Sequence, residues 1–534
     1  MARHSSRRPS VMKHRFSEVP RAQIPRSSFD RSHGHKTTFD AGYLVPIYVD
    51  EALPGDTFNL NMTGFARLAT PIYPVMDNMF LETFFFAVPI RLLWDNWEKF
   101  NGAQDNPGDS TDFVVPQVPY PLGAQENSLG DYLGVPINTT GPVSACAFFT
   151  RAYNLIWREW FRDQNLQNSP TVDTDDGPDN PLDYVLLRRG KRHDYFTSCL
   201  PWPQKGDPVD IPLGTTAPVR GIGYSGPMPA GSSQPNMHEA GGNIVTYNAA
   251  THFQLNNGWW GEADPSQAQF PGIYADLSEA TAATINQLRQ SFQIQKLLER
   301  DARGGTRYTE IIRSHFGVTS PDMRLQRPEY LGGGSSPLIV TPLAQTQRTD
   351  TGESPLATLS GIGTSTLSGR RHGFTKSFTE HCVLIGLISA RADLTYQQGL
   401  ERMWSRQTRY DFYWPALSHI GEQAVLSKEI YHTGEAADED VFGYQERYAE
   451  YRYKPSRISG LFRSAAAQSL DAWHLSQEFG SRPVLNATFI EDNPPVDRVI
   501  AVQTEPHFIF DSYFQLRCAR PMPMYGVPGL IDHF

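Results

Sequence analysis

Tyrosines and basic side chains alternate between residues 443 and 463. The stretch holds four tyrosines and five cations: Tyr444, Tyr448, Tyr451, Tyr453, Arg447, Arg452, Lys454, Arg457 and Arg463. Aromatic faces stack on nucleobases and interleaved cations follow phosphates, so the first four cations are candidates for binding single-stranded nucleic acid. Tyr and Arg are also common interface anchors, which makes the last three tyrosines candidates for packing within or between subunits. The sequence leaves both interpretations open and favours packing.

The first 36 residues are a second concentration of positive charge. They hold nine cations and two acids, a charge of +7 in a chain whose net charge is −10. The cations are Arg3, Arg7, Arg8, Lys13, Arg15, Arg21, Arg26, Arg31 and Lys36. This arm has few core-forming residues, so it should be extended and poorly ordered unless a polyanion or a neighbouring subunit orders it. It either faces nucleic acid, releasing counterions from phosphates, or is a solvated tail.

No catalytic or metal-binding motif is recognisable. No serine has glycine at both −2 and +2, and GxxxxGK and HExxH are missing. Asp173 and Asp175 have calcium-loop spacing, but the twelfth position is Tyr184, so a solvated acidic loop is expected. His33 and His35 have no third metal ligand beside them. The sequence therefore predicts no catalytic residue, no metal and no cofactor.

Cysteine usage and hydropathy constrain the cellular setting. The four cysteines lie far apart with no CxxC pair, which indicates neither a disulfide framework nor a zinc ribbon. The longest apolar run, residues 382–390, is too short to cross a bilayer, and the basic N-terminus lacks the apolar core of a secretory signal. We therefore expect a reducing compartment and no membrane partner.

The stretch "NMFLETFFFAVPIRLLWDNWEKF", residues 78–100, is unusually apolar. Its first part predicts a strand that is apolar on both faces, and the part from Pro89 predicts a short helix. We expect residues 84–86, all Phe, to divide between a core and neighbouring structure. Trp94 and Trp97 should pack at or near a subunit contact. The alternative is that all of these side chains are internal core.

Alternating patterns predict strands at both ends of the chain. Apolar and polar side chains alternate over residues 58–63 and again within 505–520, while Gly64 shifts the phase after the first run and suggests a bulge. One helix is predicted within residues 141–165 with Ser144 as its cap, and another over 279–303, following Asp276. Residues 166–270 and 331–373 are rich in Gly, Pro and small polar residues and predict long loops. One β domain with large insertions is the most economical explanation, because the first and last strands of an antiparallel barrel can be neighbours.

Five long phrases closely resemble one family, the major capsid proteins of gokushovirus-like microviruses, which are small icosahedral single-stranded DNA bacteriophages. They are "TTFDAGYLVPIYVDEALPGDTF", "RAYNLIWREWFRDQNLQ", "SHFGVTSPDMRLQRPEYLGGGS", "ADLTYQQGLERMWSR" and "FGYQERYAEYRYKPSRISGLFRS". They run in order from about residue 37 to the C-terminus. The region from about 200 to 275 follows no fixed family pattern.

The resemblance implies a mainly β fold, an eight-stranded antiparallel jelly-roll barrel with long loop insertions and a few α-helices. It implies a homo-oligomeric T = 1 icosahedral shell around circular single-stranded DNA, and no enzymatic activity. Other implied partners are a small basic DNA-condensing protein, a minor pilot protein and a host surface receptor that a surface protrusion would contact. The chain would belong to the virion and assemble in the bacterial host cytoplasm.

The resemblance and the patterns together divide the chain into four parts. These are an interior-facing basic arm (1–36), a first part of the jelly roll with helices (37–195), long insertions that include the protrusion and helix 279–303 (196–372), and a second part with the C-terminal strand (373–534). The alternative is a carbohydrate-binding β-sandwich protein or a glycan-active enzyme, in which Trp259 and Trp260 would stack on sugar rings. A stand-alone nucleic-acid-binding module would be expected to be basic overall, and this chain is acidic.

Overall fold

The computed structural model describes residues 25–207, 209, 219–220, 222–224, 252–256, 259–262, 274–275, 285–305, 308–317, 326–344, 346, 358–368 and 371–525. The contacts of the chain divide it into two compact units. The first unit combines Met1–Pro203 with Ser320–Phe534, and the second is Gln204–Thr319. Each unit has its own secondary structure.

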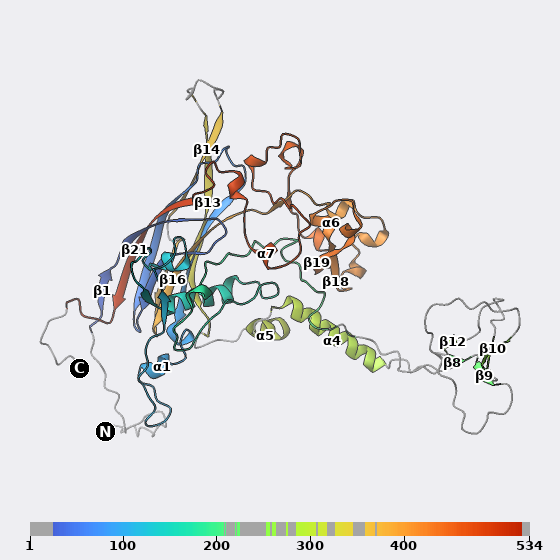
Figure 1. Cartoon of the computed structure of the whole chain (residues 1–534), viewed down its shortest axis with the longest axis horizontal. Helices are drawn as coiled ribbons and strands as arrows, with labels where there is room; N and C mark the ends of the chain where they lie inside the picture. Colours follow the sequence, from blue (N-terminus) through green and yellow to red (C-terminus); the bar gives the residue numbers. More distant parts are fainter. Residues whose placement is uncertain are drawn as a thin grey trace, which may run out of the picture. The chain divides into compact units, whose positions relative to one another are not determined.

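The first unit is built on one ten-stranded antiparallel sheet that curls on itself (Figure 1). Its strands are β1 (Ser27–Asp30), β2 (His33–Phe39), β3 (Val45–Ala52), β4 (Thr57–Leu68), β5 (Met79–Pro89), β13 (Glu329–Ala344), β14 (Leu359–Leu367), β15 (Gly373–Ser377), β16 (Cys382–Ala392) and β21 (Phe508–Arg520). Eight of them follow the order β1-β21-β4-β14-β13-β5-β16-β3, while β15 pairs with β4 and β2 with β21. This mainly β architecture confirms the predicted fold class and is consistent with a jelly-roll barrel.

The last strand of the sheet lies beside its first long strand, as the sequence predicted. β21 pairs with β4 from Phe508 opposite Leu68 to Ala519 opposite Thr57. The bulge predicted at Gly64 is wrong, because the ladder runs through this residue without a register shift. A Cβ at Gly64 would lie 3.0 Å from the ring of Phe510, so glycine keeps the strand in phase and Phe65 points outward.

The long loop predicted over residues 331–373 is wrong for residues 331–344 and 359–367, which form strands. β13 pairs with β5 and then with β14, and together they form a hairpin that extends past the neighbouring strands (Figure 1). In "LGGGSS" other backbones approach so closely that a side chain at these glycines would clash with them. A Cβ at Gly333 would lie 2.0 Å from the carbonyl oxygen of Thr83, and one at Gly334 would lie 2.4 Å from that of Arg371. A composition typical of loops therefore belongs to tightly packed strands.

The end of the basic arm is ordered by the chain itself. β1 and β2 both pair with β21, so residues 27–30 and 33–36 need neither DNA nor a neighbour to become extended strands. The prediction of poor order is therefore wrong for this part. Residues 1–24 lie outside the described residues.

β5 is buried on both faces, which explains its continuous apolar sequence. Phe85 belongs to the core inside the curled sheet. Phe86 belongs to a second core on the other side, where Phe84 packs partly buried against it. The three phenylalanines thus divide between two cores of the same chain, which agrees with the internal-core alternative, and a contact of any of them with a neighbouring subunit stays a prediction.

The second core contains the short helices that cover β5 and β16. They are α1 (Trp97–Phe100), α2 (Leu129–Leu133) and α3 (Phe148–Ile156), which a π turn (Trp157–Phe161) extends. The predicted cap is wrong: Ser144 lies in strand β7 (Val143–Cys146), which pairs with β6 (Gln117–Tyr120), and the helix starts four residues later. The helix predicted from Pro89 is two pieces, a 3-10 turn over Ile90–Leu92 and α1.

A third core holds the segment between β16 and β21. It contains β17 (Thr395–Tyr396), β18 (Glu422–Leu426), α6 (Ser427–Ile430), β19 (Val441–Glu446), β20 (Ser456–Arg457) and α7 (Ala487–Ile490).

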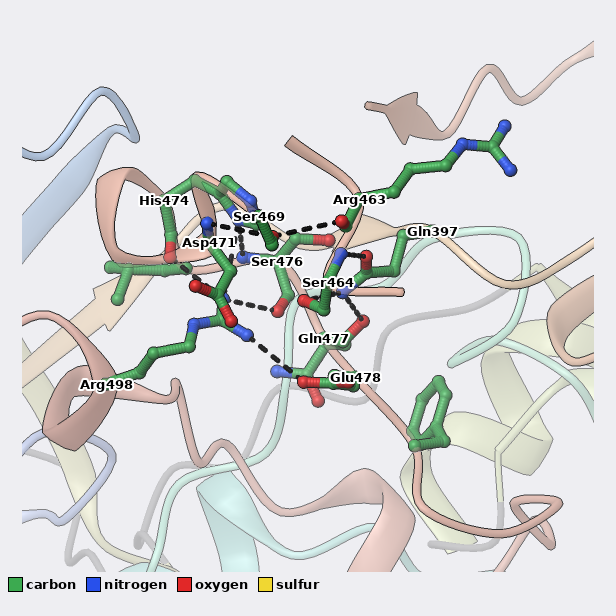
Figure 2. A network of polar contacts seen from close by, with 12 residues as sticks. Gln397, Arg463, Ser464, Ser469, Asp471, His474, Ser476, Gln477, Glu478 and Arg498 are labelled. Atoms are coloured by element: carbon green, nitrogen blue, oxygen red, sulfur yellow. Dashed lines mark hydrogen bonds and ion pairs between the residues drawn. The ribbon is translucent and has the colours of Figure 1, made fainter. Parts of the chain in front are cut away.

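Figure 2 shows a polar network within this segment. Gln397 exchanges hydrogen bonds with Ser464 at 2.8 and 2.9 Å, and Arg498 donates to the carbonyl oxygens of His474 and Ser476, both at 2.9 Å. Because the Ser476 backbone N–H donates to Nδ1 of His474 (3.2 Å), the imidazole proton lies on Nε2. Val496, two residues before Arg498, is part of the sheet core. The network therefore ties the loop around 464–476 to the sheet.

The second unit contains two helices and several short strands. α4 (Ile285–Arg303) confirms the predicted helix, although its predicted start at 279 lies outside the described residues. His315 of α5 (Tyr308–Phe316) lies 2.7 Å from Asp301 of α4. The strands are β8 (Val219–Arg220), β9 (Ile222–Tyr224), β10 (His252–Asn256), β11 (Trp259–Glu262) and β12 (Tyr274–Ala275).

Candidate subunit-contact surface

Six large aromatic side chains are exposed on the third-core segment. Their exposed fractions range from 41% to 68%, far above what a monomer needs at one place on its surface. We call this set the aromatic surface: Trp404, Tyr410, Phe412, Tyr413, Trp414 and Tyr451.

Short turns hold these side chains outward. The chain from 402 to 417 consists of three 3-10 turns, Arg402–Trp404, Arg409–Asp411 and Pro415–Leu417, which have no room for a helical apolar stripe. The Asp411 carboxylate accepts the backbone N–H groups of Thr408 (2.7 Å) and Gln407 (3.0 Å), and these bonds lower the pKa of Asp411. The turn that presents Tyr410 is thereby fixed.

Arginines stack on the rings, and one of them connects the aromatic residues of 404–414 to Tyr451. The Arg406 guanidinium lies 5.3 Å from the Phe412 ring centroid and 4.5 Å from that of Tyr451. Arg409 lies 4.5 Å over Trp414, whose indole N–H donates to the Arg409 carbonyl oxygen (3.1 Å). Contacts of this kind contribute about 0.5–1 kcal/mol each at exposed sites. The aromatic side chains are therefore held in place before anything binds them.

The three tyrosines predicted to pack at a contact lie at this surface but differ in how far they are exposed to solvent. Tyr448 is 3% exposed, and its hydroxyl donates to the Tyr410 carbonyl oxygen (3.2 Å). Tyr451 and Tyr453 are 50% and 37% exposed. Tyr448 thus supports the surface from beneath, while the other two are available to a partner. Their role in a subunit contact stays a prediction.

The sequence-predicted cations are largely committed to acids of the same chain. Lys454 and Arg457 both reach Glu401, at 2.7 and 3.5 Å. Arg452 pairs with Glu446, and Arg447 donates to the Tyr410 carbonyl oxygen (3.3 Å). Phosphates would have to compete with these partners, so the local charges favour a protein contact over nucleic acid.

A pocket of about 220 Å³ opens beside the aromatic surface, with Trp404 and Tyr453 in its lining. Glu429 at its base is 4% exposed, and burial raises its pKa. Its two oxygens accept the Tyr195 hydroxyl (2.8 Å) and the Leu426 N–H (3.0 Å). With both oxygens bonded, Glu429 acts as a structural support and the pocket is suited to receive an inserted side chain.

Sequence reasoning missed most of the aromatic surface, because it searched for periodic patterns. The signal was present as "MWSRQTRYDFYW", residues 403–414, which holds five aromatic residues in a stretch that fits neither a helix nor a strand period. Large aromatics without a period have no core face to fill, so such a stretch indicates exposed contacts.

Trp94 and Trp97 lie in the second core. Trp94 is fully buried, and its indole N–H donates to Asp176 (2.7 Å). Trp97 is partly buried, stacks on Phe100 with ring centroids 5.9 Å apart, and meets the His381 ring at 5.4 Å. Trp94 has no solvent-exposed surface, so any subunit contact at this place would involve Trp97 and Phe100.

The acidic loop at 173–183 binds an arginine of the same chain. Arg151 and Asp179 are both fully buried and form a bidentate pair, with Nε to Oδ2 at 2.8 Å. Arg151 also donates to the carbonyl oxygens of Leu93 and Asp175, both at 2.9 Å. Asp175 is exposed, as expected of a solvated loop, whereas Asp179 anchors it.

The described cations of the arm have partners within the chain. Arg31 forms a bidentate pair with Asp50 at 2.7 and 2.9 Å. Lys36 lies 3.2 Å from Asp511, with both side chains mostly exposed. Arg26 donates to the Thr57 hydroxyl. Arg3 through Arg21 lie outside the described residues, so contact of the arm with nucleic acid stays a prediction.

Other kinds of site are not found in the part of the chain that the structure describes. Among these residues no group of three His, Cys, Asp or Glu side chains could hold a metal ion. Within the same ranges, no helix has the length and apolar character that crossing a bilayer requires. The four cysteines, all described, are free.

Comparisons with known proteins cover nearly the whole chain. A family model described as "Capsid protein (F protein)" matches residues 17–530. The chain is 50% identical over 528 residues to capsid protein VP1 of Bdellovibrio phage phiMH2K, with 98% of each chain covered. It is 46% identical to capsid protein VP1 of Chlamydia phage 1, again with 98% of each covered, and 35% identical to that of Spiroplasma virus 4, with 97% covered.

Proposed function

The chain belongs to the capsid protein (F protein) family, and from this premise we propose that its copies assemble into a T = 1 icosahedral shell enclosing circular single-stranded DNA. Its role in the virion is structural and not enzymatic. The observation that carries the self-assembly proposal is the aromatic surface. It is preformed, uncovered, and flanked by cations that are already paired.

The exposed area of this surface is that of an interface. A large aromatic side chain offers on the order of 200 Å². Six of them at 41–68% exposure present on the order of 600 Å² of largely apolar area. That is most of the ~800 Å² which each partner contributes to a standard interface. Tyr453 and the adjacent pocket extend it.

The basic arm supports the DNA part of the proposal. Six of its cations precede residue 25, the first that the structure describes, against a single acid, Glu18. We place this arm inside the shell, where it neutralises packaged DNA alongside a small basic DNA-condensing protein. A minor pilot protein and a host surface receptor complete the proposed partners. The second unit is the proposed receptor contact, and assembly takes place in the host cytoplasm.

Expression of the chain in bacteria, followed by sedimentation and electron microscopy, tests self-assembly. Wild-type protein should form closed particles with a mass on the order of megadaltons. A double variant, Trp404→Gln with Tyr410→Gln, should stay folded by circular dichroism and lose at least ten-fold in particle yield. Phe316→Gln is the matched control, since Phe316 is 77% exposed in the other unit. Particle formation by the double variant at the wild-type level would remove the support for this contact.

The arm is tested separately by removing residues 1–24, a cut that spares β1 and β2. Particles should still form, but their DNA content should fall. Normal packaging by the truncated chain would exclude the arm from this role. Trp259→Tyr with Trp260→Tyr tests the carbohydrate alternative. That alternative predicts that the wild-type chain binds glycans and that this tryptophan variant binds them more weakly.

A further inference from the structure

One face of the sheet is open on the strands β2, β21, β4 and β15. Along β4 and β21 every second residue is buried in the core and its neighbours are exposed or half-buried. The outward residues are Asn59, Asn61, Thr63, Phe65 and Arg67 on β4, and Ile509, Asp511, Tyr513, Gln515 and Arg517 on β21. We call this set the open face. β5 and β16 differ, since both of their faces are buried.

Two aromatic rings stand side by side on the open face. Phe65 is opposite Asp511 and Thr63 is opposite Tyr513, so Phe65 and Tyr513 are diagonal neighbours about 7–8 Å apart at Cα. They are 48% and 52% exposed. Neither ring contributes to the core, because the adjacent positions on each strand fill it. Rings at this spacing can each take one base.

Cations and amides surround these rings. Arg67 lies opposite Ile509 and Arg517 opposite Asn59, one toward each end of the ladder. Arg67 has no acid within ion-pair distance among the described residues. Arg517, by contrast, lies opposite Asp30 of β1, and hydrogen bonds from Ser32 together with the charge of Arg517 lower the pKa of that carboxyl. Asp511, between the two arginines, is paired with Lys36 at 3.2 Å. The remaining positions hold uncharged hydrogen-bonding side chains and one exposed apolar residue, Ile509. A hollow of about 340 Å³ lies at Asn59, Asn61, Gly373 and Thr375 on the same face.

The basic arm joins this face at its edge. β1 pairs with β21, and its first residue, Ser27, lies opposite Arg520 at the border of the open face. The 24 residues that precede the described chain carry six cations and one acid. The sequence therefore supplies further positive charge for a polyanion next to β1 along the chain.

We propose that the open face is a binding site for the enclosed single-stranded DNA, in which Tyr513 and Phe65 stack on bases while Arg67 and Arg517 contact phosphates. The inference deepens the proposed function and rests on it. Isolated rings among amides and exposed arginines suit single strands, because every base has a π face and amides can bond its edges. A second copy of the chain would instead be expected to meet a continuous apolar area, as on the aromatic surface.

Purified subunits test binding directly. Anisotropy of fluorescent oligothymidine measures affinity for Tyr513→Ser with Phe65→Ser and for the control Phe316→Ser. Both target side chains point away from the core, so the variant should fold. Loss of stacking should weaken binding on the order of ten- to a hundred-fold, while the control is unchanged. Arg67→Gln with Arg517→Gln should reduce the slope of log affinity against log salt by about 1.4.

Assembled particles give a second, independent measurement. Ultraviolet irradiation followed by mass spectrometry should find nucleotide adducts on Tyr513 or Phe65. Particles of the serine variant that package DNA normally and subunits that keep wild-type affinity would overturn the inference. So would folded variant subunits that bind oligothymidine normally but fail to assemble, because the open face would then be a contact between copies. If wild-type chains form no shell, the proposed function fails, and the subunit measurement still decides this inference.

Discussion

The buried pair of Arg151 and Asp179 gives the sharpest test of how the second core is held together. Both side chains are fully buried, and Asp179 also accepts the Tyr184 hydroxyl. Replacing Asp179 by Leu removes the buried carboxylate beside the guanidinium and leaves its charge with two backbone carbonyls and, at 3.4 Å, the exposed carboxylate of Asp175. Breaking a buried pair in this way costs about 3–5 kcal/mol of unfolding free energy.

The companion variants separate charge from packing. Arg151→Met should cost a similar amount, because it strands the carboxylate. The double variant should be more stable than either single one by at least about 1 kcal/mol, because it leaves no buried charge without a partner. Its remaining cost comes from neutral groups that lose a hydrogen bond, namely two backbone carbonyls and the Tyr184 hydroxyl. Lys36→Met breaks the exposed pair with Asp511 and should cost at most about 1 kcal/mol.

Urea unfolding followed by tryptophan fluorescence measures all four variants. Trp94 reports on this region, because its indole bonds to Asp176 in the same loop. Strictly additive costs in the double variant, or a cost below about 1 kcal/mol for Asp179→Leu, would refute the argument that this loop is anchored by a buried ion pair.

Three further outcomes follow from the fold. Burial lowers the pKa of His372, whose ring nitrogens bond Thr83 and Ser336. The folded chain then binds the proton less tightly than the unfolded one, so stability should fall as pH drops below about 6.5, and less so in His372→Gln; equal pH profiles would contradict this. Gly333→Ala places a Cβ 2.0 Å from a carbonyl oxygen and should prevent soluble expression, whereas Gly141→Ala, in open space, should not. Phe86→Ala should cost about 3–5 kcal/mol by calorimetry and outward Phe65→Ala within about 0.5.

The sequence predicted the features that depend on alternation and order along the chain. Alternation over residues 58–63 and 508–518 predicted two half-buried strands, and the structure pairs them as β4 and β21, with one face of each strand filling a core. The continuous apolar run in β5 gave a strand buried on both faces. Both are local patterns with a single physical cause.

What the sequence could not give depends on contacts between distant segments. The glycines of β13 resembled a loop, since nothing local shows that the Thr83 and Arg371 backbones approach them. The predicted helix cap at Ser144 was wrong because this residue pairs, as part of a strand, with the distant segment 117–120. The aromatic surface and the open face were missed because exposed aromatics become visible as such only when the core is known.

The sheet has one half that the chain covers itself and another half whose outer face stays open. Around β5 and β16 the chain covers its own sheet with α1–α3, so the most apolar stretch of the sequence is satisfied internally. The aromatic surface lies on turns, and the open face lies on β4 and β21, whose outward residues read as an ordinary half-exposed strand. Apolar runs in this chain therefore mark its core, and the two surfaces proposed for contact with copies and with DNA lie on segments of mixed character. A shell subunit has to be built this way, because surfaces that must wait for their partners have to remain soluble until assembly.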